Sequence, residues 1–273
     1  MSALLAVVAA VVAVAAPAQP SVTYLESRQG PSGGYAEAGR EATPGLTAWA
    51  VLGLRAAGVP PRHLADARAY LAAAEPESLA DAQLVLLALA ALGEQSPELV
   101  ARVRGELRPS GQIGPLVNTT IFGILALRAA GEPVPQTSLR WLLRQQRANG
   151  GWGWHPRGAP DSNDTAAAIQ ALRAGGVRGA AITRGLAYLR RHQRADGGYE
   201  LVRGRGSDTQ STAWAVQAFV AAGVRPSPSA LRYLQRMRRP DGSYRYSARY
   251  AATPVWVTSQ ALAAVSRRPL PIR

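Results

Sequence analysis

Two carboxyl groups and an amide are concentrated in one short segment of the chain. Asp161, Asn163 and Asp164 lie immediately before an apolar stretch that begins at Thr165. Paired carboxyl groups can donate and accept protons in acid–base catalysis. The Asn163 amide has no proton that titrates near neutral pH, so it cannot act as a general acid. Asp161 and Asp164 are therefore the candidate catalytic residues, and Asn163 is a candidate ligand contact.

The same residue types also begin helices. Asp and Asn are preferred N-caps, and acidic groups near a helix start interact favourably with the helix dipole. Other apolar stretches open in a similar way, with Asp208, Asn118 and Asp81 at corresponding positions. This recurrence favours capping, alone or combined with ligand binding, over a unique catalytic acid. Glycoside cleavage by two opposed carboxylates, drawn from Asp161, Asp164 and Asp208, is a weaker alternative.

Six apolar stretches must position these side chains. They begin 35 to 47 residues apart, at Thr47, Ala82, Thr120, Thr165, Thr212 and Thr258. Within each, the residues at offsets 0, 3, 4 and 7 form one helical stripe, and those at offsets 6 and 9 are mostly Ala or Gly. Such helices are apolar almost all round, so we expect them to be buried and closely packed. The stretches before them are amphipathic and rich in Arg.

A turn motif accompanies the apolar stretches. An aromatic-Leu pair leads, nine positions after the aromatic, to a Gly that stands two residues before a second aromatic, as from Tyr188 to Tyr199. Glycine supplies the positive φ that such turns need. Six pairs of amphipathic and apolar helices predict an all-α fold, an (α/α)6 toroid of six helical hairpins with the apolar helices as its inner ring. A linear solenoid is the alternative.

The segment 142–152 resembles the QW repeat of squalene and terpenoid cyclases, in which a Gln precedes Gly-x-Trp by four residues. Gln146, Gly150 and Trp152 match it in full, and further copies at Gln193 and Gln29 have Tyr in place of Trp. The resemblance implies a terpenoid cyclase/prenyltransferase α/α toroid over residues 19–273. It also implies that the Gln and the aromatic clamp an outer helix to the next inner helix, with the Gln amide satisfying N–H groups there.

Residues 161–166 are similar to the Asp-x-Asp-Asp-Thr-Ala motif of class II terpene cyclases, whose middle Asp protonates an alkene or epoxide. That position is Asn163 here. The resemblance therefore implies a hydrophobic, isoprenoid-like ligand in the toroid, bound without class II cyclase chemistry. One alternative is a cyclase-like enzyme that uses Asp161 or Asp164 on a linear isoprenoid. Another is a corrinoid binder like intrinsic factor, whose relatives share the toroid.

Aromatic residues are the other candidates for ligand contact. Trp49, Phe122 and Trp214 share one register, two residues after the start of their apolar stretches, so they either line a central cavity or fill the space between two helical rings. Trp154 and His155 lie outside the repeat pattern. The expected ligand-binding residues are Trp49, Phe122, Trp152, Trp154, His155, Asn163, Asp208, Trp214 and Trp256.

Composition narrows the chemistry. Cysteine is absent and the three histidines are scattered, so we expect no zinc site, no other metal and no cofactor. The net charge of +14 is uneven: residues 1–135 carry −2 and residues 136–273 carry +16, with Arg as the only basic residue apart from His. The basic half either attracts an anionic membrane surface or is simply a solvated face. No motif points to nucleic acid as a partner.

The N-terminus has the pattern of an export signal. An uninterrupted apolar run over residues 3–16 is too short to span a bilayer. It is followed by Ala16-Pro17-Ala18, which has the small-x-small pattern of a cleavage site. We therefore expect residues 1–18 to be a signal peptide or a retained anchor, and the protein to be secreted or associated with the cell envelope.

Overall fold

The computed structural model describes residues 18–272, and helices dominate this part of the chain. Six helices form an inner ring: α2 (Pro44–Ala56), α4 (Leu79–Ala91), α6 (Val117–Ala129), α8 (Ser162–Ala174), α10 (Thr209–Ala221) and α12 (Pro254–Val265). Six shorter ones lie outside it: α1 (Gln19–Glu26), α3 (Ala65–Ala72), α5 (Pro97–Gly105), α7 (Gln136–Arg144), α9 (Ala180–Arg190) and α11 (Pro228–Met237). The predicted signal segment, except Ala18, lies outside the described residues.

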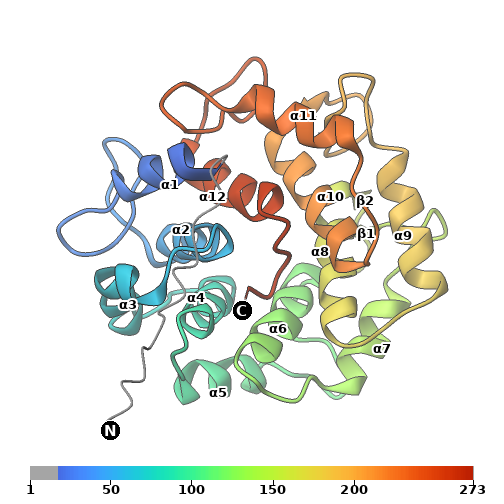
Figure 1. The fold of residues 1–273 in the computed structure, drawn as a ribbon. Coiled ribbons are helices and arrows are strands. Elements are labelled where there is room, and N and C mark those ends of the chain that lie inside the picture. The colour runs from blue at the N-terminus through green and yellow to red at the C-terminus, as the bar shows by residue number, and fades with distance from the viewer. Residues whose placement is uncertain (1–17, 273) are drawn as a thin grey trace, which may run out of the picture.

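The inner helices close on themselves (Figure 1). Each contacts the next along the chain, and α12 contacts α2. The outer helix α1 packs against α12 and covers this seam between the first and last hairpins. The closed ring confirms the predicted toroid and shows that the solenoid alternative is wrong. Within residues 18–272, no helix combines the length and hydropathy needed to cross a membrane.

Small side chains set the spacing between the inner helices, as the repeat pattern predicts. A Cβ atom added at Gly53 of α2 would lie 2.6 Å from the backbone oxygen of Ser259 on α12. Ala50 and Ala215, both three residues after a repeat threonine, have no exposed surface. Larger residues here would push neighbouring helices apart, because a close-packed interior has no space to receive them.

The repeat threonines fasten each turn to the inner helix that follows. Thr165 Oγ1 on α8 accepts a hydrogen bond from the backbone N–H of Trp152 at 2.9 Å. The same bond, at 2.9–3.0 Å, joins Thr47 to Tyr35, Thr120 to Ile113, Thr212 to Tyr199 and Thr258 to Tyr244. Helix α4 has Ala82 in this position, and it follows α3 without such a turn. The threonine therefore belongs to the turn, since it satisfies a buried N–H group that only the turn presents.

Gln146 and Trp152 connect three helices around one turn. The indole Nε1–H of Trp152 donates to the backbone oxygen of Leu142 on α7 at 2.8 Å. Gln146 Nε2 donates to the backbone oxygens of Gly150 and Ala181, both at 2.9 Å, and so ties the turn to α9. The aromatic thus joins α7 to α8 as expected. The expectation that the Gln satisfies N–H groups of the inner helix is wrong, because its Nε2 donates to backbone oxygens and its Oε1 accepts from the Arg184 guanidinium on α9 at 2.6 Å.

Two of the turns continue into short β-hairpins that hold the starts of inner helices. Strand β1 (Trp152–Gly153) pairs with β2 (Pro160–Asp161), and β3 (Tyr199–Glu200) pairs with β4 (Ser207–Asp208). In each pair, the turn aromatic is opposite the aspartate that caps the next inner helix. These hairpins therefore fix where α8 and α10 begin.

Neighbouring repeats also meet at the N-terminal ends of the inner helices. The residue two positions after a turn aromatic faces the start of the preceding inner helix. Its backbone oxygen accepts a hydrogen bond from an N–H group there: Trp154 from Val117 (3.1 Å), Leu201 from Ser162 (2.9 Å) and Tyr246 from Thr209 (2.7 Å). In the first repeat this residue is Glu37, whose carboxylate accepts from the N–H groups of Val255 and Trp256, both at 3.1 Å. A side chain thus closes the ring between the first and last repeats.

The C-terminal tail leaves α12 and turns into the centre of the ring (Figure 1). The backbone N–H of Leu270 donates to Gln170 Oε1 on α8 at 2.9 Å, and Leu270 and Ile272 are both buried. Gln170 stands three residues beyond Ala167, one helical turn further from the N-terminal end of α8. The tail therefore fills the ring toward the C-terminal ends of its inner helices.

Candidate functional site

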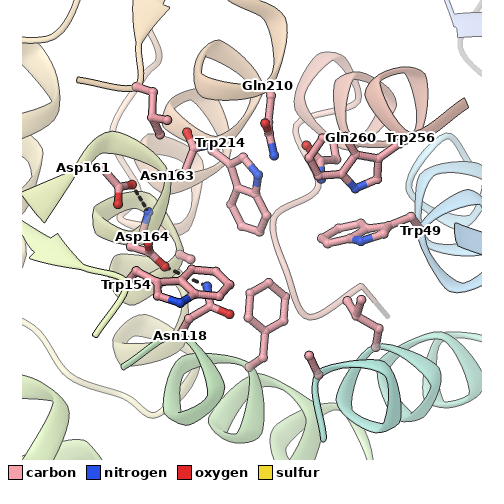
Figure 2. A pocket seen from close by; sticks show the side chains of 15 residues that line it. Trp49, Asn118, Trp154, Asp161, Asn163, Asp164, Gln210, Trp214, Trp256 and Gln260 are labelled. Atoms are coloured by element: carbon pink, nitrogen blue, oxygen red, sulfur yellow. Dashed lines mark hydrogen bonds between the residues drawn. The ribbon is translucent and has the colours of Figure 1, made fainter. Parts of the chain in front are cut away.

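The inner ring encloses a cavity of about 380 Å³ near the N-terminal ends of its helices. Side chains from all six inner helices line it (Figure 2). The deeper layer takes one residue from each helix, two positions after the start of the repeat: Trp49, Leu84, Phe122, Ala167, Trp214 and Gln260. Because the repeat register is the same in every helix, these six side chains lie at one depth.

Three aromatic rings from alternate inner helices meet in this layer. Trp49, Phe122 and Trp214 contact one another edge to face, with ring centroids 5.9–6.2 Å apart and planes inclined at 81–87°. This arrangement places the positive edge of one ring against the negative face of the next, which is favourable. The side chains face the centre of the ring, so the alternative that they fill the space between the two helical rings is wrong.

A second layer lies one helical turn closer to the N-terminal ends. It consists of residues four positions earlier on five of the helices: Ala80, Asn118, Asn163, Gln210 and Trp256. Trp154 and Leu201, from the two β-hairpin segments, complete this rim, and Trp154 is half exposed. The cavity is thus apolar and aromatic in its depth and more polar at its rim.

Asp161 and Asp164 lie at the rim, connected to the neighbouring helix α6. Asp161 Oδ1 accepts from the backbone N–H of Asp164 at 2.8 Å and so caps α8, as the sequence predicts. The Asn118 side chain donates from Nδ2 to Asp164 Oδ1 at 2.7 Å. Asp164 is only 4% exposed. One carboxyl group therefore caps the helix, and the other lies buried beside the cavity.

The surroundings of Asp161 and Asp164 affect the pKa values of the two carboxyl groups differently. Burial, reinforced by the charge of Asp161 and by the hydrogen bond between the two carboxyl groups, raises the pKa of Asp164 to about 8, against the opposing effect of the Asn118 amide. Burial also raises the pKa of Asp161, but its hydrogen bonds with Asp164 and Asn163 and the charge of His192 oppose that rise. At neutral pH Asp164 is therefore mainly protonated, so the rim carries a neutral carboxyl group.

Outer helix α9 and the residues after it support Asp161 from behind. The Tyr188 hydroxyl donates to the backbone oxygen of Pro160 at 2.8 Å. His192 is buried and stacks on the Tyr188 ring, with 4.3 Å between centroids. The two side chains thus hold β2, and with it the carboxyl group of Asp161, against the ring.

The structure brings most of the expected site residues together. The cavity is lined by Trp49, Phe122, Trp154, Asp161, Asn163, Asp164, Trp214 and Trp256. Trp152 is fully buried in the turn and does not reach the cavity, since its indole is bonded to α7. His155 is exposed and lies outside it. Five further residues line the cavity that were not predicted as ligand contacts: Leu84, Asn118, Leu201, Gln210 and Gln260.

Asp208, also expected to contact the ligand, does not line the central cavity. It caps α10, where Ser211 donates its backbone N–H at 2.6 Å and its hydroxyl at 2.8 Å. Burial raises the pKa of Asp208 to about 6, although these hydrogen bonds oppose the rise. The carboxyl group borders a separate surface hollow with Arg205 and Tyr246. Asp208 is therefore not paired with Asp161 and Asp164 across the cavity.

The side chains that line the cavity include no Arg, Lys or His. Over residues 18–272, His, Asp and Glu side chains form no cluster of three or more that could hold a metal ion. The described part of the chain thus offers apolar surface, neutral amides, indoles and one carboxyl pair at this site.

No protein-family model and no curated protein sequence matches the chain. Solved structures do resemble it. A variant of the type II terpene cyclase MstE from Scytonema, with geranylgeranyl dihydroxybenzoate as its substrate, matches with a TM-score of 0.71 at 14% identity, over 92% of this chain and 96% of that one. Protein geranylgeranyltransferase-I from Candida albicans, complexed with GGPP, matches with a TM-score of 0.62 at 13% identity, over 82% and 83%.

A bacterial diterpene enzyme extends the comparison. The ent-copalyl diphosphate synthase from Streptomyces platensis has a TM-score of 0.58 at 23% identity, over 82% of this chain and 50% of that one. These proteins share the ring of helical hairpins with this chain, and at such identities the likeness concerns the fold. The chain therefore has the same α/α-toroid fold as these terpene cyclases and this prenyltransferase.

Proposed function

We propose that the central cavity binds a hydrophobic, isoprenoid-like molecule. The observation that carries this proposal is the aromatic layer of Trp49, Phe122 and Trp214, whose rings contact one another and line the cavity between the inner helices. Small-molecule sites are typically about 300–1,000 Å³ and mainly apolar, and this cavity has both properties. Structures of the same fold hold a geranylgeranyl substrate and GGPP, which supports the proposed ligand class.

The cavity favours an isoprenoid over the corrinoid alternative. A corrinoid macrocycle is far bulkier than a linear isoprenoid and would not fit in about 380 Å³. A flexible unsaturated chain can instead follow the aromatic faces, and burying it removes apolar surface from water.

Binding is tested by filling the cavity. Ala167 lies in the deeper layer, so Ala167→Phe adds a ring to the space a ligand would occupy without deleting an existing contact. We expect farnesol binding, followed by tryptophan fluorescence, to weaken at least tenfold while the circular dichroism spectrum is unchanged. Ala180→Phe, at an exposed position on α9, is the matched control and should bind like the unaltered protein. Equal binding by both variants would place the ligand elsewhere.

A second candidate function follows from Asp164. A protonated carboxyl group at the rim can transfer its proton to an alkene carbon, which leaves a carbocation at the neighbouring carbon for the aromatic faces to stabilise. Loss of a proton from a carbon next to the cationic centre to the carboxylate then forms the alkene product and restores the acid, so the isomerisation needs no other reactant. In the class II motif that residues 161–166 resemble, the acid stands at the position that Asn163 occupies here. This candidate function therefore depends on Asp164 acting as the acid instead.

Turnover separates the two functions. Incubation with linear polyprenyl substrates and analysis of extracts by mass spectrometry should give no cyclised product if the protein only binds. A catalytic role requires a product that disappears in Asp164→Asn and Asp161→Asn while both variants still bind ligand. A product formed equally by both variants would exclude the carboxyl pair as its source.

The basic half and the N-terminal segment support a further part of the proposal, that the protein is exported and works near an anionic membrane. Residues 136–273 carry +16, and attraction between such a surface and anionic lipid is screened by salt. We expect binding to vesicles of phosphatidylglycerol that weakens as salt increases. Equal binding to neutral phosphatidylcholine vesicles would contradict the role assigned to charge.

A further inference from the structure

Gln260 is a polar side chain in the apolar layer of the cavity. It comes from α12, lies at the same depth as Trp49, Phe122 and Trp214, and is only 2% exposed. Neither its Oε1 nor its Nε2 atom has a hydrogen-bond partner among residues 18–272. A buried carboxamide without partners is unfavourable, because it has lost its bonds to water and gained none in return.

The other buried glutamines of the inner helices differ from Gln260. Gln83 Nε2 donates to the Thr119 backbone oxygen at 2.8 Å, and Gln170 Oε1 accepts from the C-terminal tail. Gln217 Nε2 donates to the backbone oxygen of Ala213, one turn earlier on α10, at 3.3 Å. Each has at least one partner within the protein, and none of the three lines the cavity. Gln83 Oε1 also lacks a partner, but among these four glutamines only Gln260, which faces the cavity, lacks a partner at both of its polar atoms.

We infer that Gln260 is a polar anchor that recognises a neutral group of the ligand able both to donate and to accept a hydrogen bond, as a hydroxyl does. The inference rests on the proposed function, since it specifies the class of molecule in the same cavity. A carboxamide presents an acceptor and a donor side by side, and a hydroxyl can satisfy both. A charged group is unsuited to this depth, because no cation lines the cavity and burying an unpaired charge is very costly.

The neighbouring side chains make one wall of the cavity polar. Figure 2 shows Gln210 of α10 and Trp256 of α12 beside Gln260, with Trp49 below. On the α4 side, Leu84 offers only apolar surface. A ligand with a hydroxyl at one point and a hydrocarbon chain elsewhere would therefore enter in a preferred orientation.

The test compares farnesol with farnesene, which share a carbon skeleton, farnesene having one more double bond in place of the hydroxyl group. Tryptophan fluorescence should show that the unaltered protein binds farnesol about tenfold more tightly, the ratio expected from one net hydrogen bond. Gln260→Leu should lose this preference by weakening farnesol binding and leaving farnesene binding equal or tighter. Gln217→Leu removes a buried glutamine outside the cavity and should keep the preference.

A second measurement shows that Gln260→Leu remains folded. Replacing an unpartnered buried amide with an apolar side chain of similar size should raise the thermal midpoint of the ligand-free protein by about 2–4 °C. If the unaltered protein binds both compounds equally, or if Gln260→Leu keeps the preference, the anchor assignment is wrong while the hydrophobic cavity stands. If the protein binds neither compound, the proposed function itself fails.

Discussion

The Asn118 amide on α6 donates a hydrogen bond to Asp164 Oδ1 on α8 across 2.7 Å, at the rim of the cavity. Because the carbonyl oxygen of a carboxylic acid is a better acceptor than its hydroxyl oxygen, this bond favours Oδ1 as the carbonyl oxygen and Oδ2 as the oxygen that carries the proton of Asp164. A single amide thus fixes the orientation of the one carboxyl group at the rim that is mainly protonated at neutral pH.

The proton on Asp164 gives the stability of the protein a defined pH dependence. Its pKa is about 8 in the folded chain and near 3.8 in the unfolded chain. Between these values the folded chain keeps a proton that the unfolded chain has released, so raising the pH favours unfolding. The stabilisation of the folded chain by protonated Asp164 is complete below pH 3.8 and is lost as the pH rises through about 8.

We expect the free energy of unfolding to fall between neutral pH and about pH 8 by up to about 1.4 kcal/mol per pH unit. Asp164→Asn, which imitates the protonated acid, should remove this slope. Asp208, with a pKa of about 6, contributes mainly below this window. Urea unfolding at pH values across the window measures the effect. Asp66→Asn, at an exposed position, is the control and should retain the slope.

Removing the hydroxyl of a repeat threonine should destabilise the fold. Thr165→Val preserves the shape of the side chain but leaves the buried N–H of Trp152 without its acceptor. We expect a loss of about 1–3 kcal/mol in denaturant unfolding. Thr183→Val on α9 removes a hydroxyl that is exposed, so its effect should be within about 0.5 kcal/mol. Similar losses in the two variants would mean that the bond from Trp152 contributes little.

The carboxylate of Glu37 acts as the cap of α12, whose own N-cap residue Thr253 makes no side-chain cap. Glu37→Ala should therefore cost about 0.5–2 kcal/mol. Glu37→Gln should lie between, because its amide oxygen still accepts but carries no charge for the helix dipole. Glu41→Ala, an exposed change in the same loop, should be nearly neutral. Chemical denaturation of the three variants side by side tests this order.

The tail should contribute to stability as core residues do. Leu270 is 4% exposed, and Leu270→Ala should cost about 2–5 kcal/mol through lost burial and the cavity left behind. Val202→Ala, at an exposed apolar residue, should change little. The thermal midpoints of the two variants distinguish these cases, and an unchanged midpoint for Leu270→Ala would show that the tail packs only loosely.

The fold could be predicted because one pattern recurs along the chain. Five copies combine a glycine turn, a repeat threonine and an apolar stretch of helical period, and the sixth, at Ala82, shares the apolar stretch, so an error in reading one copy is corrected by the others. The same register placed Trp49, Phe122 and Trp214 in one layer correctly. It could not show by itself whether that layer faces the ring centre or the outer helices, since both faces of the inner helices are apolar.

The site was harder to predict where it departs from the repeat. Gln260 occupies the same register as Trp214, so aligning the repeats by position instead of by residue type would have found it. Leu201 stands two residues after its turn aromatic, in the register of Trp154, but nothing in the sequence showed that this register reaches the cavity. Trp152 was expected in the cavity as one of the aromatic residues near the turns and His155 because it lies outside the repeat pattern, but the first completes a turn and the second is exposed.

The bond from Glu37 to the start of α12 has a consequence for the order of folding. Each hairpin is stabilised by contacts between residues near in sequence, and such contacts form rapidly. The seam joins Glu37 to residues 218 and 219 positions away, so it must form by closing a long loop of chain, at an entropic cost that local contacts do not share. Folding should therefore end with the meeting of the first and last hairpins, and hydrogen exchange should find α12 among the last helices to gain protection.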